Sequence, residues 1–231
     1  GNRFHLLDKH LGLEAGRRVS AGLEQVAVRL SLESTYRSSV DLVEQLLGVR
    51  IEAQTAHAAV QRIGTEVRRQ QAEEVRAVCE AEIEPQPGEL KSEVLLVEAD
   101  GVNIRLQREG RLKSIEIRHG VAYDGWKKRG KRVELKNRRR YAAIGPSEQF
   151  WEQFGLGVSQ TWDLGEVKRV IVGGDGAVWV KQGLQQFIGS EFQLDAYHTR
   201  KRIGQALEND QCARAVADLV IKGDSKTALE V

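Results

Sequence analysis

Two aspartates in this chain of 231 residues each follow an apolar run and precede a glycine. Asp100 comes after VLLVEA, and Asp175 comes after VIVGG. Two carboxylates close together repel each other unless a divalent cation offsets their charge. Carboxylate oxygens suit Mg²⁺ or Mn²⁺, and two such ions could activate a water or a DNA 3′-hydroxyl for attack at phosphorus. The glycines beside both acids would let a phosphate backbone approach closely.

Three strands are expected around the first of these acids, at 93–99, 102–107 and 115–123. Asp100 ends the first strand, and Asp100-Gly101 would form the tight connection to the second. Short turns then join all three strands into an antiparallel meander. A structural role therefore stands beside the chemical one, because Asp-Gly at a strand end is a common turn signal.

Helices and strands alternate after this meander. We expect a helix at 146–154, a strand at 167–172, a helix at 178–187 and a short strand at 191–194, with helices in most of the rest. This is the element order of the RNase H-like fold, in which the fourth and fifth strands lie parallel to the first. Helical crossovers are what parallel strands need. Because the first and fourth strands are neighbours in that fold, Asp100 and Asp175 would converge at one edge of the sheet.

Residues 1–84 are predicted to be helical, and the segment EPQPGE separates them from a second domain at 90–231. Within the helical region, 38–69 has the spacing of a helix-turn-helix, with Gly48 ending its first helix at 38–47 and a second helix at 52–69. Plain packing of two helices is the alternative. The side chains of the second helix that suit base edges and phosphates are Gln54, His57, Gln61 and Arg62.

The net charge is only +2, but basic residues are concentrated between Lys127 and Arg140. This block, KKRGKRVELKNRRR, holds nine basic residues against the single acid Glu134. Such a block suits contacts with DNA phosphates, whose strength falls steeply with salt. A solvated, lysine-rich hairpin is the alternative. The candidate phosphate-binding residues are Lys127, Lys128, Arg129, Lys131, Arg132, Arg138, Arg139 and Arg140.

Composition excludes some classes of protein. No run of about 18 apolar residues is present, so no membrane-spanning helix is expected. Cys79 and Cys212 lie far apart without a C-x-x-C spacing, which predicts a reduced compartment and no structural zinc site. We expect the tryptophans to pack in the core or at its rim, with stacking on a base as the alternative. They are Trp126, Trp151, Trp162 and Trp179.

Four blocks of sequence, in this order, closely resemble the ISLre-type family of insertion-sequence transposases, long catalogued as an uncharacterised family. They are VEADGVNIRLQREG, EIRHGVAYDGW, VIVGGDGAVWVKQG and FQLDAYHTRKRI, and they span most of 92–207. The upstream stretch TYRSSVDLVEQLLGVRIEAQTAHAAVQRIG is similar to the family's upstream region. The resemblance implies a bacterial, cytoplasmic, nucleoid-associated DDE-type transposase. Such an enzyme cuts transposon ends and joins them to target DNA, with two Mg²⁺ or Mn²⁺ ions and as a homodimer or larger assembly.

The resemblance also implies roles for individual residues. Asp100 and Asp175 would be the first two metal-binding acids, and the third, a glutamate on a later helix, is expected beyond Val231, so that the catalytic domain is truncated at its C-terminal end. Asp195 and His198, in LDAYH, match a block at the end of the fifth strand. Asp195 could support the metal pair, and His198 could contact the scissile phosphate. The alternative is a helix cap at Asp195 and a half-buried histidine.

Two other functions are compatible with the same residues. One is a non-catalytic DNA-binding module derived from a transposase, which would use the basic block and the helix-turn-helix but no metal. The other is an RNase H-like nuclease acting on RNA–DNA hybrids or junctions, which would share the fold and the acids and differ in substrate.

Overall fold

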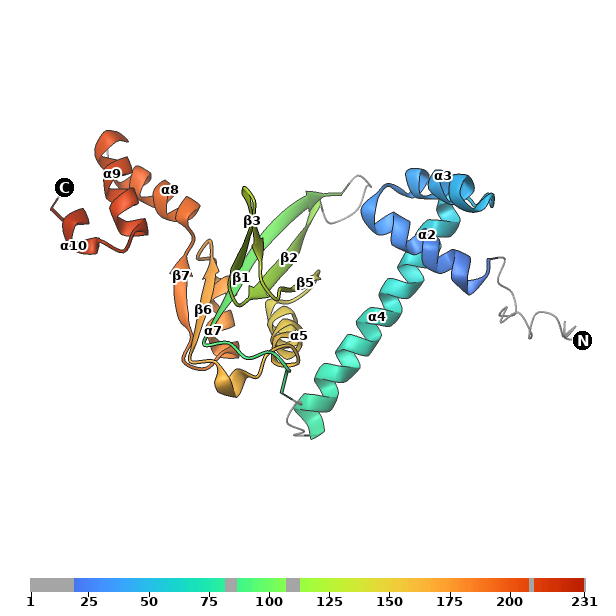
Figure 1. Cartoon of the computed structure of the whole chain (residues 1–231), viewed down its shortest axis with the longest axis horizontal. Helices are drawn as coiled ribbons and strands as arrows, with labels where there is room; N and C mark the ends of the chain where they lie inside the picture. Colours follow the sequence, from blue (N-terminus) through green and yellow to red (C-terminus); the bar gives the residue numbers. More distant parts are fainter. Residues whose placement is uncertain (1–18, 82–86, 107–112, 208–209, 231) are drawn as a thin grey trace, which may run out of the picture. The chain divides into compact units, whose positions relative to one another are not determined.

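The computed structural model describes residues 19–81, 87–106, 113–207 and 210–230 (Figure 1). The chain divides into two compact units, Gly1–Glu74 and Val75–Val231. Residues 84–86, which begin the predicted boundary between domains, lie outside the described residues.

Three helices make up the described N-terminal region: α2 (Ala21–Glu33), α3 (Tyr36–Leu47) and α4 (Ala53–Ala81). Ser20 and Thr35 cap the first two, because their side-chain oxygens accept backbone N–H groups of the first helical turn. Gly48 ends α3 in the left-handed conformation that was predicted for it, with φ of 67°. The helices enclose a small apolar core of Ala27, Val43 and Ala56.

Five strands form a mixed sheet in the order β5-β2-β1-β6-β7 (Figure 1). The strands are β1 (Val94–Arg105), β2 (Ser114–Tyr123), β5 (Arg139–Ala143), β6 (Arg169–Gly174) and β7 (Glu191–Leu194). The pairs β1–β2 and β2–β5 are antiparallel, whereas β1–β6 and β6–β7 are parallel. A separate hairpin, β3 (Trp126–Arg129) and β4 (Arg132–Leu135), lies between β2 and β5 in the sequence.

The predicted turn at Asp100-Gly101 is wrong. Residues 93–99 and 102–107 were expected to be two strands, but β1 runs without interruption through both aspartate and glycine. Its antiparallel pairing with β2 continues from Leu96↔Tyr123 to Arg105↔Ser114, and Asp100 pairs with His119 in the middle of it. This long ladder of backbone hydrogen bonds overrides the local turn preference of Asp-Gly. The third antiparallel strand of the sheet is instead β5, whose first two residues end the basic block.

Helices connect and follow the strands of the sheet. They are α5 (Ser147–Ser159), the 3₁₀ turn η1 (Leu164–Glu166), α6 (Val178–Lys181), α7 (Gly183–Gln186), α8 (Ala196–Ala206), α9 (Asp210–Ile221) and α10 (Ser225–Ala228). The helix expected at 178–187 is therefore two short helices. Gly183 begins the second, where a Cβ would lie 2.5 Å from the Trp151 ring.

The main core lies between the sheet and α5. Leu95, Val97 and Ala99 alternate along β1 as buried residues and belong to one apolar cluster with Phe150 and Phe154 of α5. Side chains of successive strand residues point to opposite faces. The residues between the buried ones, Asp100 included, therefore point to the face of the sheet away from α5.

Gly174, the last residue of β6, allows β1, β6 and α6 to pack closely. A Cβ there would lie 2.6 Å from the Ala99 carbonyl oxygen and 2.7 Å from Cγ1 of Val180. Neither the backbone of β1 nor the buried Val180 can move away without a substantial energetic cost. Even one methyl group would therefore push the parallel strands apart at this level.

We expect Gly174→Ala to destabilise the protein by about 1–3 kcal/mol, the usual cost of overpacking a close contact. The matched control is Gly204→Ala in α8, where nothing lies within 4 Å of the added Cβ. Because alanine favours helix over glycine, this control should be neutral or slightly stabilising. Urea denaturation of the two variants measures both effects. Equal stability of Gly174→Ala and the parent chain would contradict the packing described here.

Candidate functional site

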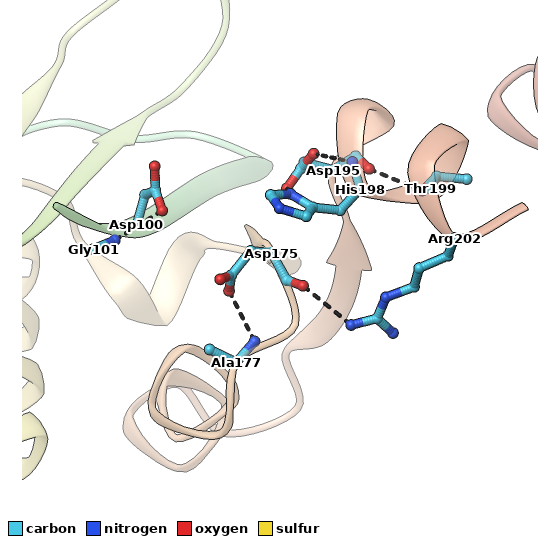
Figure 2. Close-up of polar contacts among 8 residues, drawn as sticks. All are labelled: Asp100, Gly101, Asp175, Ala177, Asp195, His198, Thr199 and Arg202. Carbon is cyan, nitrogen blue, oxygen red and sulfur yellow. Dashed lines mark hydrogen bonds and ion pairs between the residues drawn. The ribbon is translucent and has the colours of Figure 1, made fainter. Parts of the chain in front are cut away.

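Three aspartates occupy equivalent positions on three neighbouring strands. The β1–β6 pairing ends at Ala99↔Gly174, and the β6–β7 pairing ends at Gly174↔Leu194. The next residue along each strand is an aspartate: Asp100, Asp175 and Asp195. Figure 2 shows Asp175 between Asp100 on one side and Asp195 on the other, in agreement with the strand order β1-β6-β7. We refer to Asp100, Asp175 and Asp195 as the aspartate row.

Asp100 and Asp175 are each held by one local hydrogen bond. Oδ1 of Asp100 accepts the N–H of Gly101 at 2.8 Å, and Oδ1 of Asp175 accepts the N–H of Ala177 at 2.8 Å (Figure 2). Gly176 has φ of 84°, a left-handed conformation that turns the chain back towards Asp175. Asp100 is exposed and Asp175 is half-buried. The two acids lie next to each other, as the sequence predicted, but only Asp175 follows the end of its strand, because β1 continues past Asp100 to Arg105.

Asp195 caps α8, which confirms the alternative prediction of a helix cap at this residue. Its Oδ1 accepts the backbone N–H of His198 at 2.8 Å, and its Oδ2 lies 2.7 Å from Nδ1 of the same residue (Figure 2). Burial alone would raise the pKa of Asp195, but the hydrogen bonds from His198 and the charge of that ring lower the pKa below its ordinary value. Since Nδ1 of His198 contacts Asp195, Nε2 is the ring nitrogen left for other contacts.

A cavity of about 650 Å³ lies over the aspartate row. Its walls include residues that sequence reasoning missed, Glu98, His119, Tyr123 and Tyr197. Glu98 accepts a hydrogen bond from the Tyr123 hydroxyl at 2.6 Å, and burial followed by this bond raises the pKa of Tyr123 well above its ordinary value. Tyr123 therefore stays a neutral donor. The spacing of two residues between Glu98 and Asp100 was the signal that could have placed Glu98 beside the aspartate row.

In the part of the chain that the structure describes, no group of three or more His, Cys, Asp or Glu residues is placed to hold a metal ion. Asp100 and Asp175 supply oxygen ligands of the kind that Mg²⁺ prefers, but they do not complete a coordination sphere. A full site needs at least one further ligand.

The basic block divides between two elements. Its first half is the exposed β3–β4 hairpin, whereas Arg139 and Arg140 lie on the edge strand β5. The base of the hairpin is fixed by the almost fully buried carboxylate of Asp124. Oδ2 of Asp124 accepts hydrogen bonds from Trp162 Nε1 at 3.0 Å and Asn137 Nδ2 at 2.8 Å.

The four tryptophans differ in their surroundings. Trp151 and Trp162 are buried in the core, as predicted, and Trp179 is half-buried against them. Trp126 is 58% exposed at the start of β3, where it lines the cavity over the aspartate row.

The four side chains that were predicted to face DNA on the second helix of the helix-turn-helix are all exposed on α4. Two of them also take part in packing between helices. His57 makes an edge contact with the Tyr36 ring, with centroids 5.1 Å apart, and Arg62 forms an ion pair with Glu24. Gln54 and Gln61 have no such contact in the described part of the chain. That these residues bind DNA stays a prediction.

The contribution of Asp195 to stability should separate into a cap and a charge. Asp195→Ala removes the cap of α8 and should cost about 1 kcal/mol, whereas Asp195→Ser keeps a capping oxygen but loses the charge and the Oδ2 contact with the His198 ring. Because the folded-state pKa of Asp195 is lowered, the charge stabilises the fold above the ordinary pKa of 3.8, and this contribution is lost as pH falls through the lowered value. Denaturation curves should therefore show the stabilities of parent and Asp195→Ser converging below about pH 4. A gap that widens on acidification would contradict this assignment.

Comparison with known proteins gives one family. A sequence model described as "Uncharacterised protein family (UPF0236)" matches residues 1–231. A UPF0236 protein from the vanSb 3′ region of Streptococcus gallolyticus is 27% identical over 99% of this chain and 49% of its own length. Two UPF0236 proteins of Caldanaerobacter subterraneus subsp. tengcongensis are each 26% identical over 91% of this chain and 41% of their own length. The chain thus spans about half the length, or less, of the curated relatives it matches. Among the described residues no helix is long and apolar enough to cross a membrane. The chain belongs to the UPF0236 family.

Proposed function

We propose that this chain carries the first two metal-binding acids of a DDE-type DNA transposase of the ISLre type. The observation that carries the proposal is the β1–β6 register, which ends at Ala99↔Gly174 and leaves Asp100 and Asp175 next to each other. The strand order β5-β2-β1-β6-β7, with three antiparallel strands followed by two parallel ones, supports an RNase H-like fold. In that fold acids at the junction of the first and fourth strands bind divalent metal.

The residues present fit part of a two-metal site. In the described part of the chain, Oδ1 of each acid is engaged by a backbone N–H, and Oδ2 of Asp100 and of Asp175 makes no hydrogen bond. Two adjacent carboxylates whose outer oxygens accept no hydrogen bond are tolerated best when a cation offsets their charge. Bound Mg²⁺ or Mn²⁺ would supply an activated hydroxyl and stabilise the leaving oxygen at phosphorus. A third acid is still required, and we propose that a residue of the longer protein supplies it.

Asp195 and His198 have a defined place in this proposal. The contact with Asp195 fixes the orientation of the His198 ring at the end of the aspartate row. From there its second nitrogen could donate to a phosphate oxygen. Asp195 thus acts on the histidine and the helix, and it is not a metal ligand in this scheme.

The names of the relatives support a mobile gene. One Caldanaerobacter protein has a name that joins eleven designations, and two others join four and two. A single protein under many designations in one organism is what repeated copying of its gene would produce. The proposed partners are therefore transposon ends and target DNA, and the exposed basic hairpin is the surface proposed to contact their phosphates.

The second candidate is a DNA-binding module without catalysis. It is favoured by the exposed β3–β4 hairpin, whose basic side chains could contact DNA phosphates without a metal. DNA binding that is sensitive to salt but indifferent to Mg²⁺ and to Asp175→Asn would support this candidate.

The transposase proposal predicts Mg²⁺- or Mn²⁺-dependent nicking of DNA that carries the element's terminal repeats, by the protein at the full length of its relatives. Asp100→Asn and Asp175→Asn keep the shape of the side chain and remove its charge. Each should lower the nicking rate by more than about 100-fold, beyond the cost of losing a group that only supports a metal ligand. Asp41→Asn, at an exposed acid of α3, is the control and should leave the rate unchanged.

Unchanged nicking in both aspartate variants would overturn the proposal. Comparing duplex repeats with an RNA–DNA hybrid of the same sequence tests the substrate. Faster nicking of the hybrid would favour an RNase H-like nuclease.

A further inference from the structure

We propose that Trp126 and Tyr197 are stacking platforms for unpaired nucleobases, so that the DNA entering this site is locally single-stranded. The inference rests on the proposed function, because it takes DNA as the molecule that fills the cavity over the aspartate row.

Both rings line the same cavity as the aspartate row, and both are largely exposed. Trp126 is 58% exposed and Tyr197 is 69% exposed, whereas Trp151 and Trp162 have at most 3% of their surface exposed. Each exposed ring is steadied by one edge-on neighbour at the cavity. Trp126 contacts Tyr123 with centroids 5.6 Å apart, and Tyr197 contacts His198 at 5.0 Å. Large apolar rings that are oriented but left open to solvent are suited to stacking on a ligand.

The two rings lie on opposite sides of Asp100 and Asp175 in the strand order, but at different levels along the strands. Trp126 follows the end of β2 at which Tyr123 pairs with Leu96, towards the start of β1. Tyr197 is the second residue of α8, directly after β7. In the sheet, β1 with Asp100 and β6 with Asp175 lie between β2 and β7. Strands β2 and β7 are three strand spacings apart, about 14 Å. A nucleic-acid strand that fills the cavity would therefore meet both rings as well as the two proposed metal ligands.

The charges around the rings fit a nucleic-acid strand. Beyond Trp126 lie the five basic residues of the β3–β4 hairpin, and beyond Tyr197 come Arg200, Lys201 and Arg202 in α8. Basic side chains flanking an aromatic ring are the usual combination for single-stranded nucleic acid, because the charges hold the backbone while the ring stacks on a base. The acids of the cavity floor repel phosphates, so the basic residues beside the two rings would have to offset this repulsion.

The base that stacks on either ring must be unpaired. In a duplex each base is already stacked between its neighbours, and its face becomes available only when it is unstacked from them. Two rings in the same cavity would stabilise the separated strand where it passes Asp100 and Asp175. The protein would therefore prefer DNA that is frayed, mismatched or melted at the reacting position.

The experiment measures binding of a fluorescently labelled oligonucleotide, single-stranded or in a blunt duplex of the same sequence, to the full-length protein in EDTA. The parent for this measurement carries Asp100→Asn and Asp175→Asn, which removes the repulsion between these two acids and phosphate in the absence of metal. Trp126→Ala and Tyr197→Ala should each weaken single-strand binding by about 5- to 150-fold, the range for one stacked base. Duplex affinity should change by less than about twofold, since a paired base offers no face to either ring. Trp126→Phe and Tyr197→Phe keep a ring and should retain most of the affinity.

Val133→Ala is the matched control, because Val133 is 63% exposed on the same hairpin and has no aromatic face. Its affinity for the single strand should equal that of the parent. Single-strand binding that is unchanged in both alanine variants would overturn the inference, and so would an equal loss on single strand and duplex. A change in self-association alone, measured by sedimentation, would assign the rings to a protein contact instead and would also overturn it.

Because the metal is absent from this measurement, its failure is separate from failure of the proposed function. Nicking that depends on Asp100 and Asp175 without any ring effect would leave the transposase proposal standing and remove the stacking platforms. Ring-dependent single-strand binding without nicking would support the stacking platforms and contradict the transposase proposal.

Discussion

The parallel pairing of β1 with β6 in one register is the constraint on which the rest of this site depends. It places Ala99 opposite Gly174, so that the next residue on each strand is an aspartate. The register is fixed by burial, since Val97 and Val172 pair on the core face beneath α5. A slip by one residue would move the acids to the core face and the valines to the cavity. Core packing and the position of the acids are therefore one property of the sheet.

The electrostatic repulsion among three adjacent carboxylates is offset mostly by hydrogen bonds from nearby backbone N–H groups. Each aspartate of the row accepts an N–H close to it in sequence, from Gly101, Ala177 or His198. Asp195 also has the His198 ring, which lowers its pKa, so it is satisfied within its own helix turn. In the described residues no basic side chain contacts the carboxylate of Asp100 or of Asp175, and Arg202 donates instead to the backbone carbonyl of Asp175. That difference is why we propose the metal at Asp100 and Asp175. The chain thus separates an acid that caps a helix from two acids that we propose as metal ligands.

The convergence of Asp100 and Asp175 was predicted from the sequence, although one detail of the prediction, the turn after the first strand, was wrong. The error was the turn at Asp100-Gly101, where a local preference competes with a ladder of pairs along β2 that only the tertiary fold reveals. The β3–β4 hairpin was predicted only as the structural alternative for the basic block, and β5 was missed because its charged residues hid its alternation. The part played by Trp126 and Tyr197 could not be predicted, since 71 residues separate them and only strand order brings them to one cavity. His57 and Arg62 were predicted to face DNA, but both also contact neighbouring helices. A helix face rich in polar groups can therefore take part in packing, which the sequence alone does not reveal.

The most direct test of the account is anomalous scattering from crystals of the full-length protein grown with Mn²⁺. The account predicts an anomalous difference peak in contact with both Asp100 and Asp175, at the distance of about 2.1 Å typical of a hard divalent cation and a carboxylate oxygen. The peak should be lost in Asp175→Asn and kept in Asp195→Asn. A peak elsewhere, or no peak between Asp100 and Asp175 in well-ordered crystals, would contradict the claim that this register builds a metal site.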